Sequence, residues 1–253
     1  MKVLEIKINK KTAQVKSEKY EVILELETLF KYNVSVGKEL SLDEFVNICN
    51  ESDERQSYRI AFEALKKRLT IKELKDILIK NSINQGLINK IISDLINRKY
   101  LNDLEYALEF LDERKSSKGI NQILESLSNK GISGSILEIV KSNYRGYIEV
   151  NNFIEKYLNK KISKPKVVIS QSLKKYLYDL GFDEELIQSR VDDRMRSFYV
   201  DEKDAIKKDY IKLAKKYSNL DSEEMILVIK KQLINKGYQK TTVMEVISEF
   251  NNQ

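Results

Sequence analysis

The sequence contains no histidine, one cysteine and one proline in 253 residues. Histidine is the commonest general base in enzymes and the commonest side-chain ligand of transition metals, so both kinds of site become less expected. The single Cys49 excludes an internal disulfide and a cysteine-ligated zinc site. We therefore expect no catalytic, cofactor-binding or metal-binding residues in this chain.

Glycine is scarce as well, with eight residues, whereas charged residues make up 33% of the chain. This balance favours long helices with solvated faces and few tight turns. No apolar run approaches the ~20 residues that a membrane-spanning helix needs. The first residues alternate between apolar and polar and lack the apolar core of a signal peptide. We expect a cytoplasmic protein.

The N-terminal residues have the period-two pattern of β-strands. Residues 2–8 alternate, and residues 13–16 and 20–26 have a similar composition, which predicts a small antiparallel sheet. A short helix is expected at 26–31. The sheet would form a separate element before the remaining, helical part of the chain.

Helix start signals follow the predicted sheet. Ser41 and Thr70 are each followed three residues later by glutamate, which is the capping-box pattern. The pattern at Ser41 predicts a helix that runs to about Asn50. A second helix is expected over Arg55–Arg68. Asn102 is expected to cap another helix, whose basic end and following Gly119 suit a helix C-terminus and a turn.

One short pattern recurs along the chain. It ends in a glycine followed by a large apolar residue, and it occurs at 123–132 (ILESLSNKGI), 173–182 (LKKYLYDLGF) and 229–238 (IKKQLINKGY). Residues 77–83 fit the same frame with Asn81–Ser82 in place of Lys–Gly. A glycine at this place is the expected left-handed C-cap of a helix. The spacing of about 50 residues leaves room for three helices in each repeat.

The sequence therefore predicts a mainly α-helical fold of tandem three-helix repeats in an elongated, curved array, preceded by the small β element. Pro165 falls at a join between repeats, where it can begin a helix. The expected limits are 1–52 for the β-rich element, 53–115, 116–163 and 164–220 for three repeats, and 221–253 for a partial C-terminal repeat.

Positive charge is concentrated in residues 54–163, which hold 20 Lys and Arg against 14 Asp and Glu. Such an excess favours phosphate or an acidic protein surface. Solvated helix faces and pairing with helix dipoles are the alternative explanation. The candidate residues for contact with a partner or DNA are Arg55, Arg59, Lys66, Lys67, Arg68, Arg98, Arg114, Lys115 and Lys118.

Eight tyrosines occur mostly at the spacing of apolar helix stripes, so we expect core packing rather than base stacking. They are Tyr58, Tyr100, Tyr106, Tyr144, Tyr147, Tyr176, Tyr178 and Tyr238. The acidic runs at 192–193 and 201–204 do not have an EF-hand pattern, and helix caps explain them better than a metal site.

Three stretches resemble the RecX family, the bacterial regulators of the RecA recombinase. They are 61–78 (AFEALKKRLTIKELKDIL), 98–133 (RKYLNDLEYALEFLDERKSSKGINQILESLSNKGIS) and 173–191 (LKKYLYDLGFDEELIQSRV). Residues 29–45 are similar to the N-terminal part of the longer Gram-positive members. The last repeat, after about Asp201, is divergent, and the first repeat has Asn81–Ser82 where the family has Lys–Gly.

The resemblance implies a right-handed superhelical array of three-helix units without enzymatic activity or cofactor. It implies binding to RecA and to its filament on single-stranded DNA. There the protein would inhibit filament growth, strand exchange, ATP hydrolysis and cleavage of the SOS repressor. A monomer with at most weak direct DNA contact is expected. A helical scaffold for another protein, or a direct nucleic-acid-binding protein, are the alternatives.

Overall fold

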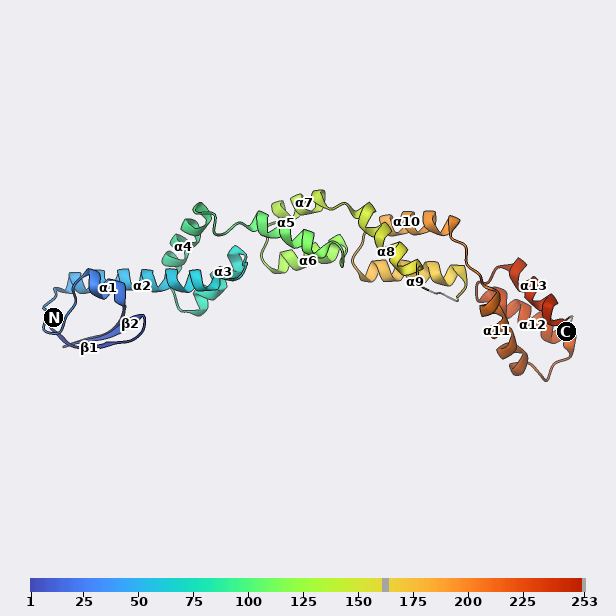
Figure 1. The fold of residues 1–253 in the computed structure, drawn as a ribbon, viewed down its shortest axis with the longest axis horizontal. Helices are drawn as coiled ribbons and strands as arrows, with labels where there is room; N and C mark the ends of the chain where they lie inside the picture. The colour runs from blue at the N-terminus through green and yellow to red at the C-terminus, as the bar shows by residue number, and fades with distance from the viewer. Residues whose placement is uncertain (161–163, 252–253) are drawn as a thin grey trace. The chain divides into compact units, whose positions relative to one another are not determined.

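The computed structural model describes residues 1–160 and 164–251 and is mainly helical, with a small sheet at the N-terminus (Figure 1). The sheet has three antiparallel strands in the order β1-β2-β3, namely β1 Val3–Ile8, β2 Thr12–Ser17 and β3 Glu21–Glu25. The short helix α1, Leu26–Lys31, follows β3 directly. The alternating segments of the sequence predicted these elements, and the prediction is confirmed.

The long helix α2, Leu42–Ala64, packs on the sheet with its N-terminal half. Ala13 of β2 is paired with Leu24 of β3, so both side chains lie on the same face of the sheet, and both are buried. They share one core with Phe45 and Ile48 of α2. The β element is therefore built onto the helical part of the chain through α2.

The expectation of two helices between residues 41 and 68 is wrong. Instead, α2 is continuous for 23 residues. No glycine or proline lies between Asn50 and Arg55 to interrupt it. Ser52, which could have marked a break, is buried and its Oγ accepts a hydrogen bond from the Glu25 backbone N–H at 2.7 Å. The helix ends before Leu65, so residues 66–68 lie in the turn that follows.

The described residues contain eleven further helices. They are α3 Ile71–Lys80, α4 Gln85–Asn97, α5 Asp103–Arg114, α6 Ile120–Asn129, α7 Gly134–Asn143, α8 Gly146–Leu158, α9 Lys166–Asp179, α10 Glu184–Ser197, α11 Lys203–Lys216, α12 Ser222–Asn235 and α13 Lys240–Asn251. The mainly α-helical fold with an N-terminal antiparallel sheet is confirmed.

The predicted helix caps are present. Ser41 and Thr70 each accept a hydrogen bond from the backbone of the glutamate three residues later, and that glutamate accepts one from the cap backbone. Asn102 Oδ1 accepts from the backbone N–H groups of Leu104 and Glu105 at 3.1 Å. These side chains satisfy N–H groups that a helix start leaves without partners.

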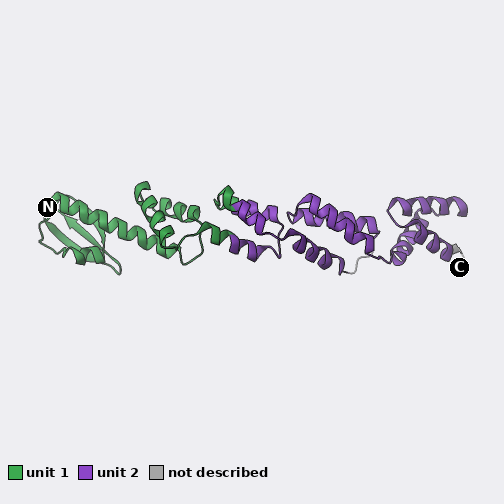
Figure 2. Ribbon diagram, turned by 90° about the horizontal axis from the view of Figure 1, so that it is seen from above, with its two compact units in different colours: residues 1–107, 128–136 green, residues 108–127, 137–253 purple. Residues whose placement is uncertain are grey.

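The chain forms two compact units, residues 1–107 with 128–136 and residues 108–127 with 137–253 (Figure 2). In the first unit α2, α3 and α4 pack together around buried residues such as Leu74, Ile91 and Leu95. In the second unit α8, α9 and α10 form one triplet, and α11, α12 and α13 form another, each with its own core. The residue limits expected for the repeats stay a prediction.

Three glycines follow the C-terminal ends of α6, α9 and α12 in the left-handed region. The φ angles are 86° for Gly131, 85° for Gly181 and 91° for Gly237, as the C-cap pattern predicts. After α3 the same place is taken by Ser82, with a φ of 59°. The repeated pattern in the sequence therefore marks the same backbone turn in all four places.

The turn after α9 is also a contact with the start of α6. The backbone N–H of Gly119 donates to the carbonyl of Leu180 at 2.7 Å, and that of Asn121 donates to the carbonyl of Gly181 at 3.0 Å. Carbonyls at the end of one helix thus satisfy N–H groups at the start of another. We call this the α6–α9 contact. Gly119 lies against the backbone of Gly181 and does more than let the chain turn, which is all that the sequence suggested.

The starts of α3 and α9 are held in related ways. Thr70 Oγ1 donates to the carbonyl of Lys130 at 2.7 Å, beside the turn that follows α6. At the start of α9, which Pro165 caps as predicted, the Glu202 carboxylate accepts from the backbone N–H of Lys166 at 2.8 Å and from that of Gln239 at 3.0 Å. Glu202 is only 2% exposed and joins two helix starts.

Replacing Glu202 by glutamine is expected to lower the free energy of unfolding by about 1–3 kcal/mol. Both carboxylate oxygens accept backbone hydrogen bonds, whereas an amide has one acceptor oxygen and its NH₂ group would face an N–H donor. Urea denaturation followed by circular dichroism measures the change. Glu223→Gln, at an exposed position, is the control. Equal stability of Glu202→Gln and the unchanged protein would contradict this role.

Candidate partner-binding surfaces

The nine candidate residues fall in two sets. In the first unit, Arg55 and Arg59 lie on α2, Lys66, Lys67 and Arg68 lie in the turn after it, and Arg98 follows α4. In the second unit, Arg114 ends α5, and Lys115 and Lys118 lie in the turn that follows it. The structure thus groups six candidates within one unit and three within the other.

Arg55 and Arg59 bind carboxylates of the β element. The Arg59 guanidinium donates to Glu25 Oε1 at 2.8 and 3.1 Å, and Glu25 is buried. Arg55 donates to Glu27 at 2.5 Å and to Glu51 at 3.1 Å. These contacts fasten β3 and α1 to α2, which is a structural use of two residues that sequence reasoning proposed for a partner. Their role in partner binding stays a prediction.

The Glu51 carboxylate has a pKa lowered from 4.5 to about 2. The largest cause is the hydrogen bond from the Lys31 ammonium, followed by that from the Tyr32 hydroxyl, and Arg55 adds to them. Both hydrogen bonds span α1 and α2, at 2.7 Å for Lys31 and 2.8 Å for Tyr32. Because the ionised form makes these bonds, protonation weakens the attachment of the β element to α2.

The stability contributed by Glu51 is expected to be lost in acid. Its pKa in the folded chain lies below that in the unfolded chain, so the contribution is complete above about pH 4.5 and declines as the pH falls toward 2. Glu51→Gln should therefore show a smaller drop in urea midpoint between these pH values than the unchanged protein. Identical pH dependence of the two proteins would show that Glu51 does not fasten the element.

The turn after α2 presents the most exposed group of candidate cations. Lys66, Lys67 and Arg68 are all exposed. Lys66 pairs with Glu63 one turn earlier at 2.5 Å. Within the described residues no carboxylate lies within 4.0 Å of the Lys67 ammonium. An exposed cation exchanges a surface partner at small cost, so Lys66 and Lys67 in this turn are available to an acidic surface or to phosphate.

The second set lies beside a polar cavity of about 400 Å³. The Arg114 guanidinium lies 5.5 Å from the ring centre of Phe110, and Lys115 pairs with Asp112 at 2.6 Å. The cavity is lined by Leu111, Asp112, Lys115, Asn143, Tyr144, Arg145, Ile148 and Glu149. A neighbouring cavity of about 340 Å³ shares Glu149. Of the candidates, only Lys115 lines either cavity.

Arg145 was not among the candidates from the sequence, because nothing in its local pattern separates it from an ordinary solvated arginine. The fold brings it from the start of α8 to Lys115 at the end of α5. Beside them the Tyr144 hydroxyl is buried without a hydrogen-bond partner among the described residues, and burial raises its pKa. This surface can offer the cations of Lys115 and Arg145 to an acidic partner, whereas the Tyr144 hydroxyl is buried beneath it.

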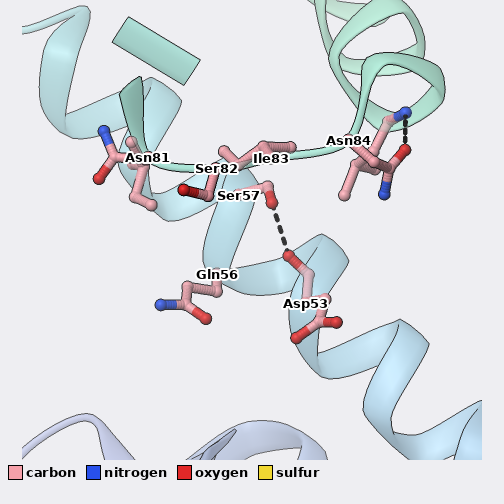
Figure 3. A pocket seen from close by; sticks show the side chains of 9 residues that line it. Asp53, Gln56, Ser57, Asn81, Ser82, Ile83 and Asn84 are labelled. Carbon is pink, nitrogen blue, oxygen red and sulfur yellow. Dashed lines mark hydrogen bonds between the residues drawn. The ribbon is translucent and has the colours of Figure 1, made fainter. Parts of the chain in front are cut away.

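A third cavity, of about 240 Å³, lies in the first unit between α2 and the turn after α3 (Figure 3). Its polar groups are bonded locally. Ser57 Oγ donates to the Asp53 carbonyl at 2.7 Å, and Asn84 Oδ1 accepts from the Leu87 backbone N–H at 2.9 Å. The site offers amide and carboxylate groups for hydrogen bonding but no pairing of a nucleophile with a base.

The expectation that the tyrosines pack in the core is only partly right. Tyr238 is 6% exposed, and its hydroxyl donates to Asp209 at 2.9 Å. By contrast Tyr100, Tyr147 and Tyr178 are 58%, 52% and 64% exposed. Tyr100 follows the end of α4 and Tyr178 lies near the end of α9, where the apolar stripe leaves the core. The helical spacing of apolar residues in the sequence does not show which of them are buried and which lie exposed at the end of the helix.

Neither a membrane-spanning helix nor a metal-binding cluster occurs in residues 1–160 and 164–251. Among them, no helix combines the length and apolar character needed to cross a membrane. Within the same residues, no three cysteine, aspartate or glutamate side chains cluster closely enough to hold a metal ion.

No family model matches the chain. Curated proteins do: the regulatory protein RecX of Bacillus pumilus is 26% identical over 239 residues, covering 92% of this chain and 91% of that protein. The regulatory protein RecX of Bacillus subtilis is 25% identical over 240 residues, covering 92% and 90%.

A solved structure shares the fold. The crystal structure of a regulatory protein RecX matches with a TM-score of 0.56 at 15% identity, covering 75% of this chain and 98% of that one. The matched relatives extend over almost the whole chain, including the stretches at 61–78, 98–133 and 173–191 on which the resemblance was based. The chain is therefore similar to proteins named regulatory protein RecX over about nine tenths of its length, which supports the RecX family, and it shares the fold of a solved member.

Proposed function

We propose that the chain is a non-enzymatic regulator that binds RecA and its filament on single-stranded DNA. The supporting observation is the similarity to proteins named regulatory protein RecX over about nine tenths of both chains. In this proposal the protein acts in the cytoplasm as a monomer. It inhibits filament growth, ATP hydrolysis, strand exchange and repressor cleavage in DNA repair and the SOS response.

The charged surfaces agree with this role. The turn at 66–68 and the cavity that Lys115 and Arg145 line present cations on separate elements. Such surfaces suit acidic side chains or phosphates of a large partner, because each exposed cation contributes little and several together set specificity and encounter rate. Arg55 and Arg59 contribute less in this proposal, since carboxylates of the β element already occupy them.

Binding to immobilised single-stranded DNA, with and without RecA, tests the proposal. RecA from the same organism is loaded with a slowly hydrolysed ATP analogue, and the protein is then added. We expect clearly tighter binding to the filament than to DNA alone. Equal binding to both surfaces would contradict filament recognition, and no binding to the filament at any salt concentration would refute the proposal.

A further inference from the structure

An aromatic cluster in the first unit contains two exposed rings that the core does not bury, beside Tyr58, which packs against that core. Tyr100 is 58% exposed and Phe62 is 39% exposed, and their ring centres lie 5.4 Å apart with an edge-to-face geometry. The ring of Tyr58 also stacks on Phe62, with ring centres 6.3 Å apart. We call these three rings the aromatic cluster. Large apolar groups that stay together in water commonly mark a contact with another molecule.

Hydrogen bonds fix the cluster and the cation beside it. Asp94 of α4 accepts from the Tyr58 hydroxyl at 3.1 Å with one oxygen and from Arg98 Nε at 2.9 Å with the other. The Asp94 carboxylate thus fixes the orientation of both the Tyr58 ring and the Arg98 guanidinium. Tyr58 and Arg98, held in this way, lose little further side-chain entropy when a ligand binds.

The turn after α4 adds a second cation. Lys99 has a φ of 62°, which is uncommon for a residue with a side chain, and its backbone N–H donates to the Ile96 carbonyl at 2.9 Å. This left-handed turn places Lys99, which is exposed, directly between Arg98 and Tyr100 in the chain. Lys66 lies in the turn that follows α2, four residues after Phe62. Cations are therefore close neighbours of the exposed rings in the chain.

We propose that the aromatic cluster is a stacking site for the bases of a single-stranded nucleic acid, with Arg98 and Lys99 bound to its phosphates. Exposed rings accept any base by stacking, and neighbouring cations follow the sugar–phosphate backbone. An acidic peptide would use the cations but would gain little from two exposed ring surfaces. This proposal rests on the proposed function in one respect, namely that the single strand bound here is the DNA of the RecA filament.

Fluorescence anisotropy with a labelled thymidine oligomer of about 20 nucleotides, without RecA, tests the site. We expect Tyr100→Ala to bind about tenfold more weakly than the unchanged protein, with the same dependence on salt. Tyr100→Phe keeps the ring and should bind normally. Tyr178→Ala removes an equally exposed tyrosine from α9, outside the cluster, and should also bind normally.

The cations are distinguished from the rings by the salt dependence. Arg98→Gln together with Lys99→Gln should reduce the slope of log affinity against log salt by about 1.4, at about 0.7 for each lost phosphate contact. An abasic oligomer has no bases to stack, so it should bind the unchanged protein and Tyr100→Ala with equal affinity. That result would show that the ring contacts bases.

Three results would overturn the stacking site: equal affinity of Tyr100→Ala and the unchanged protein, equal affinity of the unchanged protein for abasic and thymidine oligomers, or preference for an acidic peptide over the oligomer. Circular dichroism of each variant shows that it is folded. Because RecA is absent, these outcomes do not depend on filament binding. Failure to bind the filament would refute the proposed function and leave the oligomer result unchanged.

Discussion

Replacing Gly119 by alanine is expected to lower the free energy of unfolding by about 3 kcal/mol. A Cβ at this position would lie 2.3 Å from the carbonyl carbon of Gly181 and 2.4 Å from the backbone nitrogen of Phe182. Both neighbours are backbone atoms, so no side chain can rotate away. The added methyl group must push α6 from α9 and break the hydrogen bond from Gly119 to Leu180.

Gly134→Ala is the matched control for this prediction. Gly134 begins α7, and a Cβ there meets nothing within 4 Å. The change should leave stability within about 0.5 kcal/mol or raise it slightly, because alanine favours helix more than glycine does. Urea denaturation of both variants makes the comparison. Equal stability of Gly119→Ala and Gly134→Ala would show that the α6–α9 contact does not hold the second unit together.

Replacing Lys66, Lys67 and Arg68 together by glutamate is expected to weaken filament binding by about tenfold or more. Each cation at a wet surface contributes roughly 0.2–1 kcal/mol, and glutamate adds repulsion to the loss. All three side chains are exposed in a turn, so folding should be retained. Binding to RecA filaments on immobilised DNA at moderate salt is the measurement.

The control for the charge reversal changes the same number of charges elsewhere. Lys208, Lys212 and Lys215 are exposed on α11, and their replacement by glutamate gives the same net charge. If both triple variants lose affinity equally, general charge accounts for the effect. Unchanged affinity of the 66–68 variant would exclude this turn from the binding surface.

Local signals in the sequence predicted local structure well. The three strands, α1, the caps at Ser41 and Thr70 and the left-handed Gly181 each depend on neighbouring residues, so they could be identified without the fold. The same reasoning predicted two helices where α2 is continuous, because the polar residues near Ser52 resemble a helix boundary. The contact of Ser52 with Glu25, which is distant in sequence, shows that Ser52 serves the packing of the helix and does not end it.

The candidate surfaces were harder to predict than the fold. The charge excess led to the candidate cations but did not show that Arg59 binds the buried Glu25. Stripe spacing placed Tyr100 in a core, whereas it lies beyond the end of α4 and stays exposed. The position of Arg145 beside Lys115 at one cavity depends on residues that are 30 positions apart in the sequence. Each of these facts depends on tertiary contacts.

ATP hydrolysis by RecA on single-stranded DNA, measured while this protein is titrated in, tests the central claim most directly. RecA should come from the same organism. We predict that hydrolysis falls as the protein is added. Inhibition well below one molecule per RecA would indicate capping of filament ends, and inhibition only near saturation would indicate coating of the groove. Undiminished hydrolysis at saturating protein, together with no binding to the filament, would contradict the account.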